Sequence, residues 1–300
     1  MQARGGSQLP GLLFDSDMGR NIDAAIALSM LYGLGRGRVI AASVSNSSLE
    51  AAMFCDVLSR FYGSGGSLPI GLAEDGLPLE DSPMLRVPLE MKNPDGQPVF
   101  RSGIQTVIDT GEPAVVFRNA LLGQQDQQAI AVLAGPATNL ARLLALHGAR
   151  DILKSKVRLL VVAMGSFENG GRVEPRAHSD IPSAKRLFAE WPSPIVAVGV
   201  EAGNAAPYPG ERLESDLGAT PNHPLMAAYR AFREGTAGAS IPAQAAIAAL
   251  YAARSDADYW SLSAPGAISV LDDGRTTFKE AAGGLHRYVI VTPGQKDRIV

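Results

Sequence analysis

The sequence predicts a single α/β domain whose mostly parallel sheet is flanked by helices and followed by a small C-terminal β-hairpin. Short apolar, β-branched runs bounded by Gly, Pro, Ser or Asn alternate with helical patterns. The runs are apolar almost throughout, which is typical of parallel strands covered on both faces. Six strands are expected, over Leu12–Phe14, Val39–Val44, Pro69–Leu72, Ala129–Ala134, Val157–Met164 and Pro194–Val200.

Helical patterns lie between these strands. In Asn21–Leu34 the apolar residues recur three and four positions apart, which predicts an amphipathic helix. A second helix is expected over Ser47–Tyr62, because its opening Ser47-Ser48-Leu49-Glu50 fits a capping box. Two further helices are expected over Thr138–His147 and Pro182–Trp191, and two long loops over Glu74–Ser102 and Gly203–His223.

The C-terminal region breaks the strand–helix alternation. Over Tyr259–Val291 the pattern predicts a β-hairpin and a closing strand, with Asp272-Asp273-Gly274 as the turn. No internal repeat or linker divides the chain, so one domain is expected over residues 11–300 after a flexible segment at 1–10. The loop Glu74–Ser102 is rich in apolar side chains, which predicts a homo-oligomer, either a dimer or a tetramer.

Composition excludes several classes of function. The chain has 300 residues, of which 46% are hydrophobic and 19% charged, so a large core is expected. A formal net charge of −3 excludes a general nucleic-acid binder. No apolar run approaches about 18 residues, so no membrane partner is expected. The single cysteine, Cys55, excludes an intramolecular disulfide and leaves the compartment open, either cytoplasmic or exported after removal of an N-terminal signal.

Three carboxylates follow the first expected strand within nine residues, at Asp15, Asp17 and Asp23. In a parallel sheet, ligands bind at the carboxyl ends of the strands. Clustered carboxylates repel one another and are tolerated where a cation, a sugar diol or a proton offsets their charge. The alternative is an ordinary acidic turn that caps the following helix.

This acidic loop is part of a wider resemblance. Asp15-Ser16-Asp17-Met18-Gly19, followed by Asp23 and Ala25-Ile26-Ala27-Leu28, resembles the N-terminal signature of the inosine–uridine-preferring nucleoside hydrolases. Gly135-Pro136-Ala137-Thr138-Asn139-Leu140-Ala141 resembles a second family motif. Other segments resemble the family in the same order, namely Ser43–Asn46, Leu68–Leu72, Met164–Ser166 and Glu174–Ala184. The resemblance covers Leu12 to Ala253 and implies the family's α/β fold, a nucleoside or sugar-like ligand, and hydrolysis of an N-glycosidic bond.

The resemblance also implies a role for individual residues. Asp17 takes the place of the general base and of a calcium ligand, and Thr138 gives its backbone carbonyl to the ion. The implied substrate-binding positions are Asp15, Asp23, Asn46, Glu174 and Arg176. Simpler roles stay open for some of them: Thr138 as a helix cap, Asn46 as a turn residue, and Glu174 as a solvated charge. For Arg176 the alternatives are an ion pair with Asp17 or Asp23, and a side chain that points to solvent.

The chain departs from the family where calcium is bound. Ala24 and Ala245 stand at two ligand carboxylate positions, and Gln244 replaces a histidine. Calcium needs about six to eight oxygen ligands, several of them charged, so the site is expected to be degenerate. The main hypothesis is a nucleoside or N-riboside hydrolase with this altered site, and the alternative is a non-catalytic nucleoside- or sugar-binding protein. A third is a metal-free hydrolase that acts on a different glycosidic bond and uses Asp17 and Glu174 as its carboxylate pair.

Overall fold

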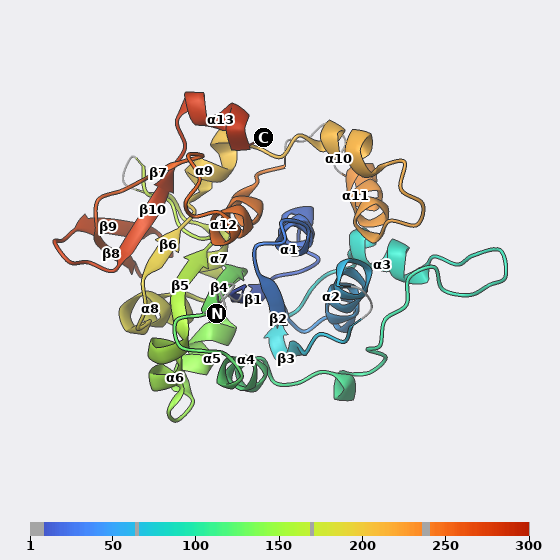
Figure 1. Ribbon diagram of the computed structural model, residues 1–300, viewed down its shortest axis with the longest axis horizontal. Coiled ribbons are helices and arrows are strands. Elements are labelled where there is room, and N and C mark those ends of the chain that lie inside the picture. The colour runs from blue at the N-terminus through green and yellow to red at the C-terminus, as the bar shows by residue number, and fades with distance from the viewer. Residues whose placement is uncertain (1–8, 64–65, 169–170, 236–240, 300) are drawn as a thin grey trace, which may run out of the picture.

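The computed structural model describes residues 9–63, 66–168, 171–235 and 241–299, so most of the expected N-terminal segment lies outside it. One mixed sheet runs through the molecule in the order β3-β2-β1-β4-β5-β6-β10-β8-β9, with β7 paired to β10 (Figure 1). From β3 to β10 along this order the strands are parallel. Their bounds are β1 Gly11–Ser16, β2 Arg38–Asn46, β3 Ile70–Leu77, β4 Ala129–Ala134, β5 Val157–Val162, β6 Ile195–Ala197 and β10 His286–Ile290.

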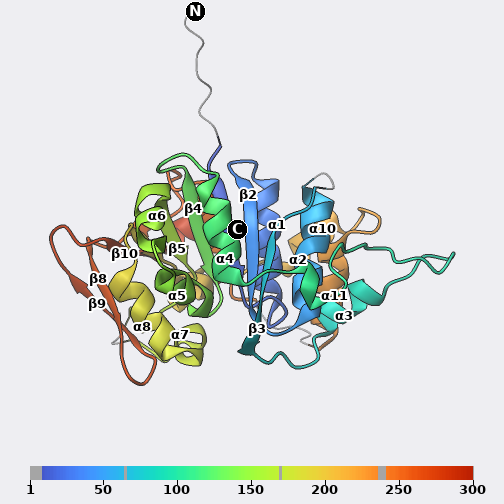
Figure 2. The same ribbon diagram turned by 90° about the horizontal axis from the view of Figure 1, so that it is seen from below.

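The helices form a layer on each face of the sheet (Figure 2). One layer comprises α1 Ile22–Gly33, α2 Leu49–Tyr62, α3 Pro83–Glu90, α9 Val200–Ala205, α10 Gly210–Leu217, α11 Pro224–Gly235 and α12 Gln244–Ala253. The other comprises α4 Pro113–Leu122, α5 Thr138–Ala145, α6 Ala149–Lys156 and α8 Ile181–Glu190. Shorter elements are η1 Val107–Asp109, α7 Pro175–Ser179, α13 Pro293–Ile299 and β7 Ser261–Leu262. No described helix is long and apolar enough to cross a bilayer.

The six predicted strands, the predicted helices and the C-terminal hairpin are confirmed, with three corrections. The loop expected over Glu74–Ser102 contains the end of β3 and helix α3, because Met84 and Leu85 are buried where α3 packs on α2 and α11. The loop expected over Gly203–His223 contains α10 and part of α9. The cap of α2 is Ser48 rather than Ser47, since Ser48 accepts a hydrogen bond from the amide of Ala51.

Burial of Met84 and Leu85 within their own chain removes two of the apolar side chains behind the expected oligomer. Leu77 and Val87 from the same segment stay partly exposed, at 36% and 40%. The homo-oligomer therefore stays a prediction.

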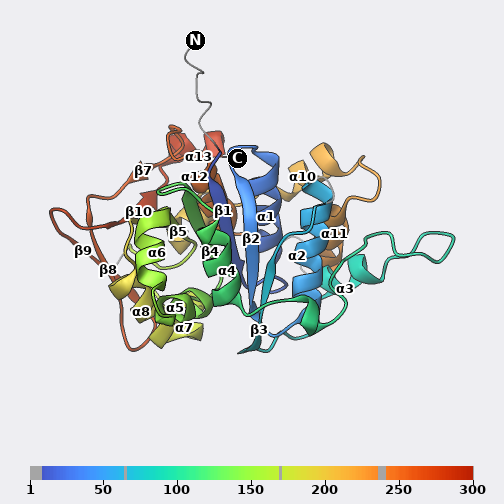
Figure 3. The same ribbon diagram turned by 60° about the horizontal axis from the view of Figure 1, so that its bottom comes forward.

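Strand β1 lies at the point where the strand order reverses, between β2 and β4 (Figure 3). The chain therefore leaves β1 and β4 towards helices on opposite faces of the sheet, α1 and α5. In open α/β sheets this switch point, at the carboxyl edge, is the crevice where ligands bind. Two glycines allow other segments to pack closely against the loop that follows β1. Gly19 has a φ of +101°, a backbone conformation that residues with a Cβ rarely adopt. At Gly135 a Cβ would lie 2.6 Å from the backbone nitrogen of Asp17.

The C-terminal hairpin, formed by β8 Gly266–Val270 and β9 Thr276–Glu280, holds the loop that follows β5. The buried hydroxyl of Thr276 accepts a hydrogen bond from the amide of Ser166 at 2.8 Å and donates to the carbonyl of the same residue at 2.9 Å. Farther along, Val173 forms an isolated bridge with Arg275. These contacts fix the approach to α7, the helix that carries Arg176.

The hairpin contact predicts that Thr276→Val loosens the chain up to α7. The substitution leaves two buried backbone groups of Ser166 without a partner, at a cost of about 1–3 kcal/mol each. Hydrogen exchange read by mass spectrometry should show faster exchange over residues 171–180. Thr276→Ser keeps the hydroxyl and should behave like the native protein, as should Thr277→Val on the exposed side of the same strand. Equal exchange in Thr276→Val and Thr277→Val would contradict this role.

Candidate functional site

Asp15 is fully buried at the carboxyl end of β1. Its Oδ1 accepts hydrogen bonds from Ser43 Oγ at 2.6 Å and from Asn139 Nδ2 at 2.8 Å. Burial nevertheless raises the pKa of Asp15 to about 7, with a smaller contribution from the nearby charge of Asp17. Its Oδ2 has no hydrogen-bond partner among the described residues. The carboxyl group is thus held firmly on one side and left unsatisfied on the other.

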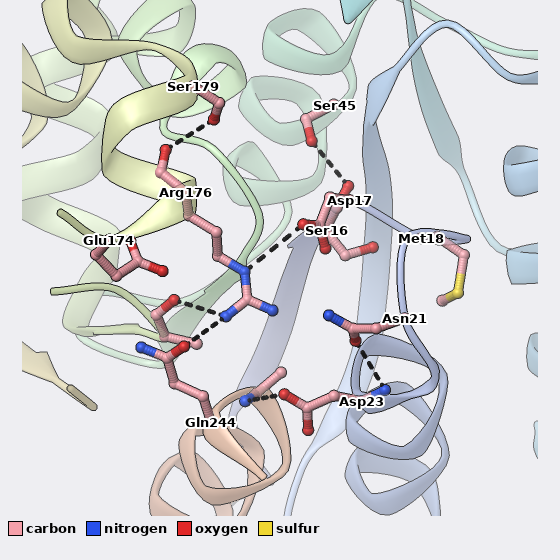
Figure 4. A network of polar contacts seen from close by, with 12 residues as sticks. Ser16, Asp17, Met18, Asn21, Asp23, Ser45, Glu174, Arg176, Ser179 and Gln244 are labelled. Carbon is pink, nitrogen blue, oxygen red and sulfur yellow. Dashed lines mark hydrogen bonds and ion pairs between the residues drawn. The ribbon is translucent and has the colours of Figure 1, made fainter. Parts of the chain in front are cut away.

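Asp17 lies on the loop beyond β1 and is 5% exposed. One of its oxygens, Oδ2, lies 3.7 Å from Nε of Arg176, an ion pair beyond hydrogen-bonding distance (Figure 4). The other oxygen, Oδ1, is buried and has no partner within the described ranges. Asp17 therefore carries an unsatisfied acceptor directly beside a buried cation.

Arg176 extends from α7 into the crevice and is 7% exposed, so its pairing with Asp17 is confirmed and the solvent-facing alternative is wrong. Its Nη1 donates to the carbonyl of Ala163 and to Oε1 of Gln244, both at 3.0 Å. Gln244 in turn donates from Nε2 to the carbonyl of Val198 at 2.8 Å. The guanidinium is thereby held by the carbonyl that follows β5, by the loop after β1 and by the first residue of α12.

Asp23 connects α1 to α12. Its two carboxylate oxygens accept hydrogen bonds from the backbone amides of Ala245 at 2.7 Å and Ala246 at 2.9 Å. The cap position of α12 is Ala243, which has no side-chain acceptor, so Asp23 supplies one from another helix. Burial raises the pKa of Asp23 to about 6, while Arg176 and the two amides favour its charged form.

Glu174 begins α7 as its cap and is 3% exposed, so the solvated-charge alternative is wrong. Its Oε2 accepts a hydrogen bond from the amide of Ala177 at 2.9 Å. Burial raises the pKa of Glu174, and the charge of Arg176 partly offsets this effect. Glu174 therefore positions the helix that carries Arg176 and adds a carboxyl group next to it.

Asn46 and Thr138 hold loops around the crevice. Asn46 donates from Nδ2 to the carbonyl of Met18 at 2.9 Å and accepts from the amide of Ser48 at 3.1 Å, which confirms its turn role. Thr138 is the first residue of α5 rather than its cap, which is Ala137. Its hydroxyl donates to Asp180, the residue between α7 and α8, at 2.5 Å. Both residues thus tie neighbouring loops together at this edge of the sheet.

Two residues of the site were not singled out by the sequence. Asn139 bonds Asp15, and it was visible only as the asparagine of the second family motif. Gln244 bonds Arg176 across the crevice, and the sequence marked it only as a departure from the family pattern. The structure places Arg176 between Asp17 and Gln244 in one polar network that sequence spacing alone does not indicate.

The donor set does not fit a calcium ion. Among the residues that the structure describes, no group of three or more His, Cys, Asp or Glu side chains is arranged to hold a metal. Ala24 and Ala245 are fully buried at the positions where the resemblance implies carboxylates. The oxygens of Asp23 are taken up by backbone amides, and a guanidinium lies beside Asp17. Calcium requires about six to eight oxygens, which this arrangement does not supply.

Solved structures share the fold along almost the whole chain. A plant nucleoside hydrolase, PpNRh1, is 20% identical, with 97% of this chain and 96% of that chain covered and a TM-score of 0.72. The inosine-uridine preferring nucleoside hydrolase of Bacillus anthracis is 17% identical, with 97% and 98% covered and a TM-score of 0.71. The type III effector protein XopQ, complexed with adenosine diphosphate ribose, is 12% identical, with 98% and 92% covered and a TM-score of 0.67.

These identities establish the fold alone, and no curated protein matches the sequence. The family is shown by a sequence model, described as that of the inosine-uridine preferring nucleoside hydrolases, which matches residues 12–292. This match spans the acidic loop, the second motif and the C-terminal strands. The chain therefore belongs to the inosine–uridine-preferring nucleoside hydrolase family.

Proposed function

We propose that this protein binds a nucleoside or a related N-riboside through its ribosyl group, holds no calcium tightly, and hydrolyses common ribonucleosides weakly or not at all. The observation that carries the proposal is the buried guanidinium of Arg176 beside Asp17. Guanidinium is permanently charged, so it repels a divalent cation from the unpartnered carboxylate oxygen of Asp17. Loss of carboxylates at Ala24 and Ala245 acts in the same direction.

A ribosyl ligand is supported by the chemistry of the crevice. A sugar hydroxyl both donates and accepts hydrogen bonds, so it matches a site that offers an unpaired carboxylate oxygen next to a guanidinium. The crevice lies at the point where the strand order reverses, which is where open α/β sheets bind their ligands. Family membership and the complex of XopQ with adenosine diphosphate ribose are consistent with this ligand class.

Weak hydrolysis follows from the chemistry of the nucleophile. Water has a pKa of about 15.7, and a bound metal ion lowers this value by many units. Without a metal, activation of water rests on a general base such as Asp17, which typically contributes about 10²–10⁴-fold. Such a factor is small beside the accelerations typical of enzymes, which begin near 10⁶-fold.

Two observations favour a second candidate function, a metal-independent N-ribosyl hydrolase. Burial raises the pKa of Glu174, as a group that protonates a leaving base requires, and Asp17 keeps an oxygen free to take a proton from water. Such an enzyme needs both carboxyl groups, on opposite sides of the scissile bond.

Binding and turnover measured on the same protein test the proposal. Calorimetry with inosine, uridine and adenosine diphosphate ribose should detect binding that neither a chelator nor added calcium changes, and Asp17→Asn should weaken it about tenfold. Release of free base should be absent or far below about 1 s⁻¹. Chelator-sensitive turnover at ordinary enzyme rates would contradict the proposal. Chelator-insensitive turnover that is lost in both Asp17→Asn and Glu174→Gln would establish the second candidate.

Calcium affinity should return stepwise as ligands are restored. The double variant Ala24→Asp with Ala245→Asp should bind calcium more tightly than the native protein, because carboxylate count tunes affinity over orders of magnitude. Adding Arg176→Asn should raise affinity by at least a further tenfold, since it removes the opposing charge. Calorimetric titration of native, double and triple variants measures both steps. Micromolar calcium binding by the native protein would show that the ligand positions are assigned wrongly.

The raised pKa of Asp15 predicts that this residue destabilises the folded protein at high pH. Its folded pKa of about 7 exceeds the ordinary value of 3.8, so the folded state binds more protons between these two values. The free energy of unfolding therefore falls as pH rises through that window, because Asp15 is then charged in the unfolded chain but resists ionisation in the folded one. This loss is complete above pH about 7. Asp15→Asn should stabilise the protein at pH about 8, by about 1.4 kcal/mol per unit of pKa difference, and little at pH about 4. Urea unfolding at the two pH values measures this, and an equal gain at both would exclude the proposed cause.

A further inference from the structure

We infer that Arg176, positioned by Gln244, binds the vicinal diol of the ribosyl ligand together with Asp17. The contact that the family resemblance assigns to a metal ion is then made by a side chain of the protein itself. This inference rests on the proposed function and names the groups of the ligand that the site recognises. It also assigns a role to Gln244, which the sequence marked only as a departure from the family.

Gln244 fixes which atoms of the guanidinium are free. Its Nε2 donates to the carbonyl of Val198, so its Oε1 must face Arg176. The flipped amide would place an NH₂ group against the guanidinium and a carbonyl against a carbonyl, so the orientation is determined by both partners. The two hydrogens of Nη1 are then used by Gln244 and by the carbonyl of Ala163.

The remaining donors face an unsatisfied acceptor. No described residue hydrogen-bonds to Nη2 of Arg176, which leaves two N–H groups available. Nε lies 3.7 Å from Oδ2 of Asp17, and Oδ1 of Asp17 has no partner in the described part of the chain. Two adjacent hydroxyls can each accept from Nη2 and donate to Asp17, which satisfies both sides at once. Figure 4 shows the guanidinium in this position, between the loop after β1 and the start of α12.

The charges around the crevice favour a neutral diol over an anionic group. Three carboxyl groups, those of Asp17, Asp23 and Glu174, lie close enough to the guanidinium of Arg176 to act on its charge. A phosphate or carboxylate placed against Arg176 would meet this excess of negative charge at short range, whereas a diol adds none. Any phosphate of a larger ligand is therefore expected to lie away from Arg176.

Gln244 is a positioning residue, and Asp23 supports it. Gln244 is the first residue of α12, and Asp23 caps the same helix through the amides of Ala245 and Ala246. The end of α12 is thereby fixed against α1. A short chain of contacts thus runs from Asp23 of α1 through the start of α12 to the guanidinium of Arg176.

Discrimination between inosine and 2′-deoxyinosine tests the inference. The native protein should bind inosine at least about tenfold more tightly, because the deoxy compound leaves charged groups of the site unpaired. Arg176→Met should abolish this ratio. Arg176→Lys keeps the positive charge but lacks the planar fork of the guanidinium, and Gln244→Leu removes the acceptor that orients this guanidinium. Each variant should reduce the preference for inosine over 2′-deoxyinosine severalfold. Arg20→Met, an exposed arginine on the same loop as Asp17, should leave it unchanged.

The outcomes separate this inference from the proposed function. If the native protein binds neither compound nor adenosine diphosphate ribose, the proposed function fails. If it binds inosine and the preference survives in Arg176→Lys and Gln244→Leu, the assignment of the diol to Arg176 is overturned. Should Arg176→Met fail to fold, as loss of a buried ion-pair partner allows, these two milder variants decide the question. Thermal melting of each variant shows which of them fold.

Discussion

The burial of the Arg176 guanidinium beside Asp17 is the interaction on which the rest of the site depends. Removal of a cation from water costs several kcal/mol unless its donors and its charge are satisfied. Here the end of β5 offers the carbonyl of Ala163, α12 offers Gln244, and the loop after β1 offers Asp17. The three partners come from distant parts of the sequence, so the cation also joins the elements that form the crevice.

The fold brings these partners together through close backbone contacts. Reversal of the strand order at β1 places the site at the switch point of the sheet, and Gly135 lets the loop after β4 approach the backbone of Asp17. On the other side, Thr276 of the C-terminal hairpin bonds both backbone groups of Ser166 and so restrains the chain that leads to α7. The antiparallel strands appended to the parallel sheet thus support the site without contributing a residue to it.

The sheet could be predicted from the sequence because its strands are short, apolar and bounded by turn residues, as β1 and β4 illustrate. The helices missed in the expected loops are eight residues or fewer, and α3 even contains Pro88, so their patterns were too brief to be read. Clustering of Asp15, Asp17 and Asp23 predicted a candidate site at a strand end, and the structure places Asp15 in β1 and Asp23 in α1. The sequence offered Asp17 and Asp23 as partners of Arg176 but could not indicate Gln244, because that residue lies 68 positions away and the contact depends on the tertiary fold.

The buried guanidinium of Arg176 says more about function than the number of carboxylates in the site. In our proposal, the alanines at positions 24 and 245 account only for weak calcium binding, whereas the buried Arg176 beside Asp17 supplies the positive charge in its place. The most direct measurement is a crystal structure grown with calcium and a riboside, read with anomalous scattering. The ribose hydroxyls should lie against Arg176 and Asp17 with no ion beside them. An anomalous peak between Asp17 and the ribose, with Arg176 turned away, would contradict this.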